Sequence, residues 1–203
     1  MTELLFSTAF TLWGLDTSWL ELIAVLLALA MIVCNIVELH WGWPLAAISS
    51  VLYFFLFWSQ HLYGGALLQV LFVVLALWGW SVWLRGIEGS PLPVTRMPSR
   101  QRLTLSISGT VLWLATGSML LNVTDTDVPW WDAFPTAFSL VGQYLLAHKH
   151  LENWAVWIGV NIVAAGLFAW KGLWLTTLLY LAFIGLSAVG WHTWAKHAQV
   201  EAA

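Results

Sequence analysis

Long apolar runs separated by short polar stretches dominate this chain. A helix that spans a bilayer needs about 20 mostly apolar residues, and seven runs come close to or reach that length. They cover Trp19 to Val37, Trp43 to Trp58, Leu62 to Leu84, Leu103 to Leu121, Ala133 to Ala147, Asn153 to Ala169 and Leu173 to Trp194. Only 8% of the residues are charged, against about 25% in a soluble domain. The pattern therefore predicts an all-α integral membrane protein with seven transmembrane helices.

The segments outside these runs set the expected organisation and orientation. Residues 1–18 precede the first span, and within them Leu4 to Leu15 is apolar but too short to cross, which suggests an interfacial helix or a partial span. Residues 85–102 carry four arginines and several glycines and prolines, so they predict a polar linker loop. Because cytoplasmic loops are enriched in Lys and Arg, we place this linker and the tail 196–203 in the cytoplasm. The N-terminus then lies outside.

An internal repeat appears when the chain is shifted by 111 residues. The matches in this register include Trp43 with Trp154, Phe57 with Phe168, Gly79 with Gly190, Trp80 with Trp191 and Trp83 with Trp194. Apolar composition alone produces many leucine matches, but it does not readily align tryptophans and a glycine without a gap. We therefore expect two three-helix repeats, 19–84 and 133–195, joined by the linker and a connecting helix, 103–121. A shift of four spans is even, so the two repeats point the same way across the membrane.

Polar side chains within the spans are the candidates for a substrate site, because they are costly in hydrocarbon unless they face the protein interior or water. The candidates are Asn35, Ser50, Gln69, Gln143, Asn161 and Tyr180. In the repeat register, Asn161 corresponds to Ser50, and Tyr180 to Gln69. A hydrogen bond between helices explains any one of these residues equally well. Asn35 lies nearer the cytoplasmic end of its span, whereas Gln69, Gln143 and Asn161 taken together favour a binding site.

Trp154, Trp157 and Asn161 are spaced three and four residues apart, which places them along one face of a helix. Such a face could hold a flat ring against the indoles and hydrogen-bond its polar substituents. A cationic ring would gain further from the indole faces. A stripe that only packs against another helix has the same spacing, so periodicity leaves both interpretations open.

Enzymatic chemistry has little support in the sequence. The six histidines all lie near predicted span ends, there is one cysteine, and no metal-binding, nucleophile-elbow or phosphate-loop motif is present. We therefore expect no catalytic residues, no metal, no cofactor and no nucleic-acid partner. A membrane enzyme or an assembly factor without transport activity stays open as an alternative from another class.

The motif Glu152-Asn153-Trp154-x-x-Trp157-x-x-x-Asn161 resembles the signature of the PnuC family of bacterial vitamin transporters, whose best-known members carry nicotinamide riboside. Gln69, with the Gly79-Trp80 pair that follows it, is similar to the first repeat of that family. The resemblance implies a three-plus-one-plus-three helix bundle, related to the SWEET sugar transporters, that assembles as a homotrimer in the inner membrane. It also implies that Trp154, Trp157 and Asn161 line the vitamin site.

By the same resemblance, transport is facilitated diffusion without ion coupling, and a cytosolic kinase traps the vitamin by phosphorylation. Nicotinamide riboside is the favoured substrate. Thiamine, which also has a flat cationic ring, riboflavin and deoxynucleosides are alternatives within the family, because aromatic stacking does not separate them. A SWEET-like sugar carrier would share the repeat, but not the aromatic motif.

Overall fold

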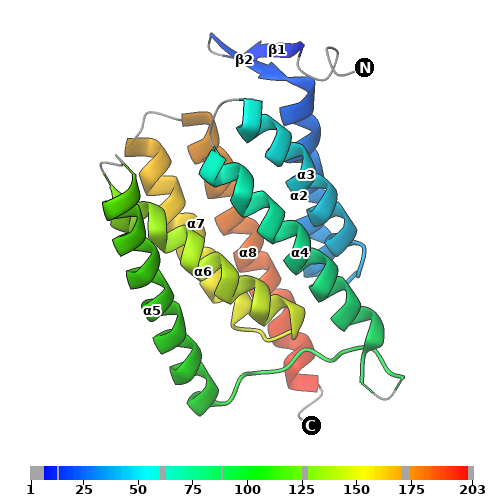
Figure 1. The fold of residues 1–203 in the computed structure, drawn as a ribbon. Coiled ribbons are helices and arrows are strands. Elements are labelled where there is room, and N and C mark those ends of the chain that lie inside the picture. The colour runs from blue at the N-terminus through cyan, green and yellow to red at the C-terminus, as the bar shows by residue number, and fades with distance from the viewer. Residues whose placement is uncertain are drawn as a thin grey trace. The chain divides into compact units, whose positions relative to one another are not determined.

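The computed structural model describes residues 7–12, 14–59, 63–87, 89–124, 128–170 and 174–200. The described elements are β1 (Thr8–Leu12), β2 (Leu15–Ser18), α2 (Trp19–Ile36), α3 (Gly42–Ser59), α4 (Tyr63–Arg85), α5 (Ser99–Val123), α6 (Pro129–Ala147), α7 (Asn153–Trp170) and α8 (Trp174–Val200). The chain forms two compact units, Met1–Leu84 and Arg85–Ala203, whose helices are labelled in Figure 1. The predicted fold class, a helical membrane protein with a three-plus-one-plus-three helix order, is confirmed.

Five helices in the described part of the chain are long and apolar enough to cross a membrane. These segments are Trp19–Ile36, Ala66–Arg85, Ser99–Val123, Asn153–Trp170 and Thr177–Ala198. Helix α3 contributes a shorter apolar stretch, Gly42–Leu56. The chain is therefore a multi-pass membrane protein. Helices α5 and α6 begin before the predicted spans, because Pro98 and Pro129 suit a helix start, where no backbone donor is needed.

The N-terminal segment contains a β-hairpin where the sequence suggested an interfacial helix. Strands β1 and β2 pair antiparallel, and Gly14 lies in the turn with a φ of +80°, a conformation that glycine adopts without strain. The Ser18 hydroxyl accepts a hydrogen bond of 3.2 Å from the Glu21 amide and so caps α2. The expectation of a helix over Leu4 to Leu15 was therefore wrong from Thr8 onward. Residues 4–6 and 13 lie outside the described part.

The 111-residue register is reproduced in the helix ends. Both bounds of α3, Gly42–Ser59, become those of α7, Asn153–Trp170, when shifted by 111. The helices before them end in the same way, because Glu38 and its counterpart Lys149 both adopt a left-handed φ, of 59° and 50°. The next amide then bonds to the carbonyl five residues back, at 2.8 Å in the first unit and 2.9 Å in the second. The two repeats therefore share their turn as well as their helices.

A tryptophan–glycine contact joins the second and third helices of the first repeat. The Trp43 indole on α3 occupies the space that a side chain at Gly79 on α4 would need. Its ring also meets Trp83 edge-on, with centroids 5.6 Å apart and planes at 84°. The missing side chain at Gly79 therefore lets the two helices approach closely.

The second repeat has the same contact. A Cβ atom at Gly190 of α8 would lie 2.6 Å from the Trp154 indole of α7, and Trp154 meets Trp194 with centroids 5.4 Å apart and planes at 85°. Trp154, Gly190 and Trp194 thus make the same packing contact in the second unit as their three counterparts make in the first. Within the second unit, α6 also packs against both α5 and α7.

Candidate substrate site

The interior of the second unit carries polar residues near the middle of its helices. Ser139 on α6 and Asn161 on α7 are both buried, and each lies eight residues from the end of its helix at the α6–α7 turn. At 1.5 Å per residue this is about 12 Å from the turn. Both residues therefore lie near the middle of their helices, which have 19 and 18 residues.

Trp157 packs directly against α6 beside a buried amide. A Cβ atom at Gly142 would lie 3.0 Å from Cε2 of the Trp157 indole, so the absence of a side chain there admits the ring. The neighbouring Gln143 is buried, and its Oε1 accepts no hydrogen bond within the described part of the chain. A buried acceptor without a partner is uncommon in native proteins and calls for an explanation.

Helix α8 aligns with α7 through two aromatic contacts. Trp154 meets Trp194 at one end, and Phe168 meets Tyr180 at the other, with ring centroids 5.1 Å apart. Asn161 lies seven residues from both Trp154 and Phe168, which is about two helical turns. Ser187 lies seven residues from both Tyr180 and Trp194. Asn161 and Ser187 are therefore at the same depth on the facing sides of α7 and α8.

Sequence reasoning missed Ser187. Its side chain is fully buried, and its hydroxyl has no hydrogen-bond partner among the described residues. Thr193, on the same helix, instead donates to the carbonyl four residues earlier at 3.0 Å, which is the usual way for a helix to satisfy a hydroxyl. The repeat register holds a signal that could have identified Ser187, because its counterpart in the first repeat is the equally buried Ala76.

Trp154 and Trp157 share a helix face but differ in their surroundings. Trp154 is 2% exposed and is enclosed by Gly190 and Trp194. Its counterpart Trp43 has the same surroundings in the first unit, so this contact belongs to the packing of the repeat. Trp157 is half-buried and has no tryptophan counterpart, because its equivalent position in the first repeat is Ala46.

The candidates in the first unit lie at different depths. Ser50 is buried, eight residues into α3, and corresponds to Asn161. Asn35 is buried one residue before the end of α2, where its Oδ1 abuts Gly42 and its Nδ2 donates to the sulfur of Met31 at 3.4 Å. Gln69 is half-buried on α4. The first unit thus places Ser50 at mid-depth and Asn35 at the α2–α3 turn.

A separate apolar cavity of about 500 Å³ lies on the surface of the second unit. It is lined by Trp113, Leu114, Trp130, Trp131, Phe134 and Val163. Val163 is two residues from Asn161, so the cavity and the polar interior lie on different faces of α7. The lining offers almost no hydrogen-bonding group, which makes it a poor match for a polar solute. In the described part of the chain, no group of three or more His, Cys, Asp or Glu side chains could hold a metal ion.

Comparison with known proteins gives consistent matches over nearly the whole chain. A family model described as nicotinamide mononucleotide transporter matches residues 18–196. The nicotinamide riboside transporter PnuC of Escherichia coli is 24% identical, over 92% of this chain and 89% of that protein. The riboflavin/roseoflavin transporter RibM of Streptomyces davaonensis is 25% identical, over 93% of this chain and 90% of that one.

A solved structure shares the fold. The crystal structure of the vitamin B3 transporter PnuC superimposes with a TM-score of 0.75 at 23% identity, and the match covers 89% of this chain and 82% of that chain.

Proposed function

Because the chain belongs to the nicotinamide mononucleotide transporter family, we propose that it carries nicotinamide riboside across the bacterial inner membrane. The family match, together with the PnuC relatives, confirms the resemblance seen in the Glu152 to Asn161 motif. The matched family and the relatives are named as transporters, which supports the proposal that this chain is a transporter and not an enzyme.

The observation that carries the proposal is the set of buried polar groups in the interior of the second unit, where Trp157 packs against α6. Gln143 and Ser187 have buried oxygens without partners in the described residues, and Asn161 is buried at the same depth as Ser187. A nucleoside-like vitamin would supply hydroxyl and amide groups for these atoms, and Trp157 would stack on its pyridinium ring. We propose that Trp154 forms the end of the Trp154–Trp157–Asn161 face that lies nearest the start of α7.

In this proposal, the first repeat contributes fewer polar side chains to the substrate site than the second. The positions equivalent to Gln143 and Ser187 are Ile32 and Ala76, so the second repeat supplies most of the hydrogen bonds to the substrate. Ser50, Gln69 and Asn35 are the first-repeat candidates, and Tyr180 completes the set on α8. Ser50 lies at mid-depth in its own unit, whereas Asn35 lies at the α2–α3 turn and Tyr180 contacts Phe168.

Transport is proposed to be facilitated diffusion that needs no ion gradient, with uptake sustained by cytosolic phosphorylation of the vitamin. In the described helices, carboxylates are sparse, for example Glu21 in the first turn of α2 and Asp132 in the first turn of α6. Such residues do not form the array of buried acids that a proton relay requires. We further propose a homotrimer with the N-terminus outside and the C-terminus in the cytoplasm, on the basis of the family resemblance and the arginine-rich linker.

A binding titration tests the substrate. Purified protein in detergent is titrated calorimetrically with nicotinamide riboside, thiamine and riboflavin. Asn161→Ala and Trp157→Ala should each weaken the preferred ligand about tenfold or more, since each removes a buried hydrogen bond or a stacking surface. Ile162→Ala is the matched control, because Ile162 lies on the same helix and is exposed. Equal affinity in all three variants and the parent protein would remove the α7 site.

Riboflavin is the second candidate, because the RibM relative covers the same length at similar identity. Its three fused rings are larger than a single pyridinium ring and carry no positive charge, so a preference for riboflavin would shift the proposal to that vitamin. Thiamine and a sugar are weaker alternatives. The same titration separates the vitamins, and a sugar carrier would bind none of them.

A further inference from the structure

The linker between the two units lies directly on the turn that precedes α7. Val94 and Met97 are both buried, and the Met97 side chain packs in an apolar cluster with Val141 and Leu145 of α6. A loop that inserts two apolar side chains in this way is anchored by burial as well as by polar contacts. Linker residues 94–97 therefore behave as a part of the second unit.

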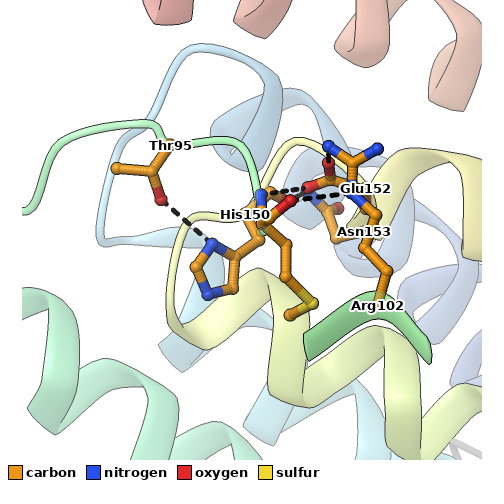
Figure 2. A network of polar contacts seen from close by, with 6 residues as sticks. Thr95, Arg102, His150, Glu152 and Asn153 are labelled. Atoms are coloured by element: carbon orange, nitrogen blue, oxygen red, sulfur yellow. Dashed lines mark hydrogen bonds and ion pairs between the residues drawn. The ribbon is translucent and has the colours of Figure 1, made fainter. Parts of the chain in front are cut away.

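Backbone hydrogen bonds attach the same segment to the turn. The Thr95 amide donates to the Lys149 carbonyl at 3.0 Å, and the Leu151 amide donates to the Thr95 carbonyl at 2.9 Å. The Thr95 hydroxyl and Nδ1 of His150 share a further hydrogen bond of 3.0 Å, drawn in Figure 2. These bonds form a short parallel bridge between residues 55 positions apart.

An ion pair joins the first turn of α5 to the residue that precedes α7. Arg102, in the first turn of α5, lies 2.7 Å from the carboxylate of Glu152. The second oxygen of that carboxylate accepts a hydrogen bond of 3.1 Å from the Met97 amide, and Nε of Arg102 donates to the Met97 carbonyl at 2.7 Å. Each of the three residues thus contacts the other two, as Figure 2 shows around Arg102 and Glu152. We call residues 94–97, Arg102 and Glu152 the linker latch.

The latch is specific to the second repeat. The positions equivalent to His150, Glu152 and Asn153 in the first repeat are Leu39, Trp41 and Gly42, which offer no carboxylate and no amide side chain. In the second repeat, Asn153, the first residue of α7, donates from Nδ2 to the His150 carbonyl at 2.8 Å. Two turns with the same backbone conformation thus differ in the contacts that hold them.

We propose that Arg102 and Glu152 are positioning residues for the substrate site: the latch fixes the start of α7 and thereby holds Trp157 and Asn161 in place for the ligand. Glu152 immediately precedes α7, and Trp157 lies one helical turn further on, so a shift at the turn is transmitted along a rigid helix. This inference rests on the proposed function, because it assigns the latch to that same site.

The contacts set the size of the expected effect. Arg102 is about half exposed, whereas Glu152 is more enclosed, so the ion pair by itself contributes little. The Glu152 carboxylate also accepts a hydrogen bond from the Met97 amide. Hydrogen bonds to charged groups are stronger than those between neutral groups. We therefore expect a three- to tenfold loss of ligand affinity when either side chain is removed.

The test compares Arg102→Ala, Glu152→Ala and the double variant with Arg100→Ala. Arg100 is a matched control, because it is an exposed arginine two residues before Arg102 in the same helical turn. Two quantities are measured: hydrogen exchange of the amides of residues 150–157, and the affinity for nicotinamide riboside well below the melting temperature. Both single variants should exchange faster and bind three- to tenfold more weakly. The double variant should lose less than the sum of the two single losses, since both single variants already break the Arg102–Glu152 ion pair. Arg100→Ala should match the parent protein.

A purely structural role would give a different result. It would lower the melting temperature of Arg102→Ala and Glu152→Ala but leave affinity unchanged in the folded protein, and that outcome overturns the proposal. Unchanged amide exchange in both variants would overturn it as well. If the parent protein binds none of the vitamins, the proposed function fails, while the exchange measurement still decides whether the latch holds the start of α7.

Discussion

Substitution of Gly190 by alanine is the sharpest test of the duplicated tryptophan–glycine packing. The new Cβ would lie 2.6 Å from the Trp154 indole, closer than carbon atoms approach in folded proteins. Trp154 is 2% exposed and held edge-on by Trp194, so the ring has little freedom to move away. Overpacking of this kind typically costs about 1–3 kcal/mol. The same substitution raises helix propensity by about 1 kcal/mol, which partly conceals the clash.

Gly185→Ala removes that ambiguity. Gly185 lies on the same helix with no atom within 4 Å of a new Cβ, so it gains the propensity without the clash. The difference between the two variants should therefore be about 1–3 kcal/mol in free energy of unfolding. For a chain of this size that is a gap of several degrees, at about 2–4 °C per kcal/mol.

Thermal unfolding in detergent measures this gap. Trp154→Phe in the Gly190→Ala background should recover part of the loss, because the smaller ring leaves room for the added methyl. Gly79→Ala should behave like Gly190→Ala, since its Cβ would meet Trp43 in the first unit. Equal melting temperatures for Gly190→Ala and Gly185→Ala would refute the reasoning.

Two other predictions concern single polar side chains. Ser187→Ala should lower ligand affinity about two- to tenfold and leave stability unchanged or slightly higher. The reason is that it removes a buried hydroxyl that has no partner in the described protein. A parallel loss of stability and affinity would contradict a role in binding. Partial burial lowers the pKa of His150, with His148 lowering it further and Glu152 opposing the shift. The neutral form is therefore favoured by folding, so the contribution of His150 to stability is present above the unfolded pKa of about 6.5 and is lost as pH falls through the lower folded value. The free energy of unfolding of His150→Gln should depend less on pH between pH 7.5 and 5 than that of the parent protein. An unchanged pH dependence would show that protonation of His150 is not coupled to folding.

The repeat could be predicted from the sequence because its signal lies in rare residues. Three aligned tryptophan pairs and an aligned glycine pair are a specific pattern. In the structure, Trp43 packs on Gly79 as Trp154 packs on Gly190. The pattern did not reveal that Trp154 is enclosed by its own unit, because spacing along one helix gives the face and not the partner. Only the position of Gly190 on α8 resolves that question.

Other features depend on contacts that no local pattern encodes. The latch joins Thr95 to His150 and Arg102 to Glu152 across more than 50 residues, and a loop rich in proline and arginine has no periodicity from which to predict its partner. The N-terminal hairpin was missed because apolar length alone does not distinguish a short helix from two short strands. Ser187 was not predicted because a serine in an apolar run has no local feature that separates a buried, unpaired hydroxyl from one that bonds to its own helix. The difference from its counterpart Ala76 is the signal that the sequence does contain.

Uptake of labelled nicotinamide riboside into liposomes that contain only this protein tests the central claim most directly. With no proton or sodium gradient, we expect the label to enter until its internal and external concentrations are equal, and to accumulate beyond that point only when a kinase and ATP are enclosed. Asn161→Ala should slow entry, whereas Ile162→Ala should not. Entry that required an ion gradient would contradict the uncoupled mechanism, and no entry above that of empty liposomes would contradict the assignment of this substrate.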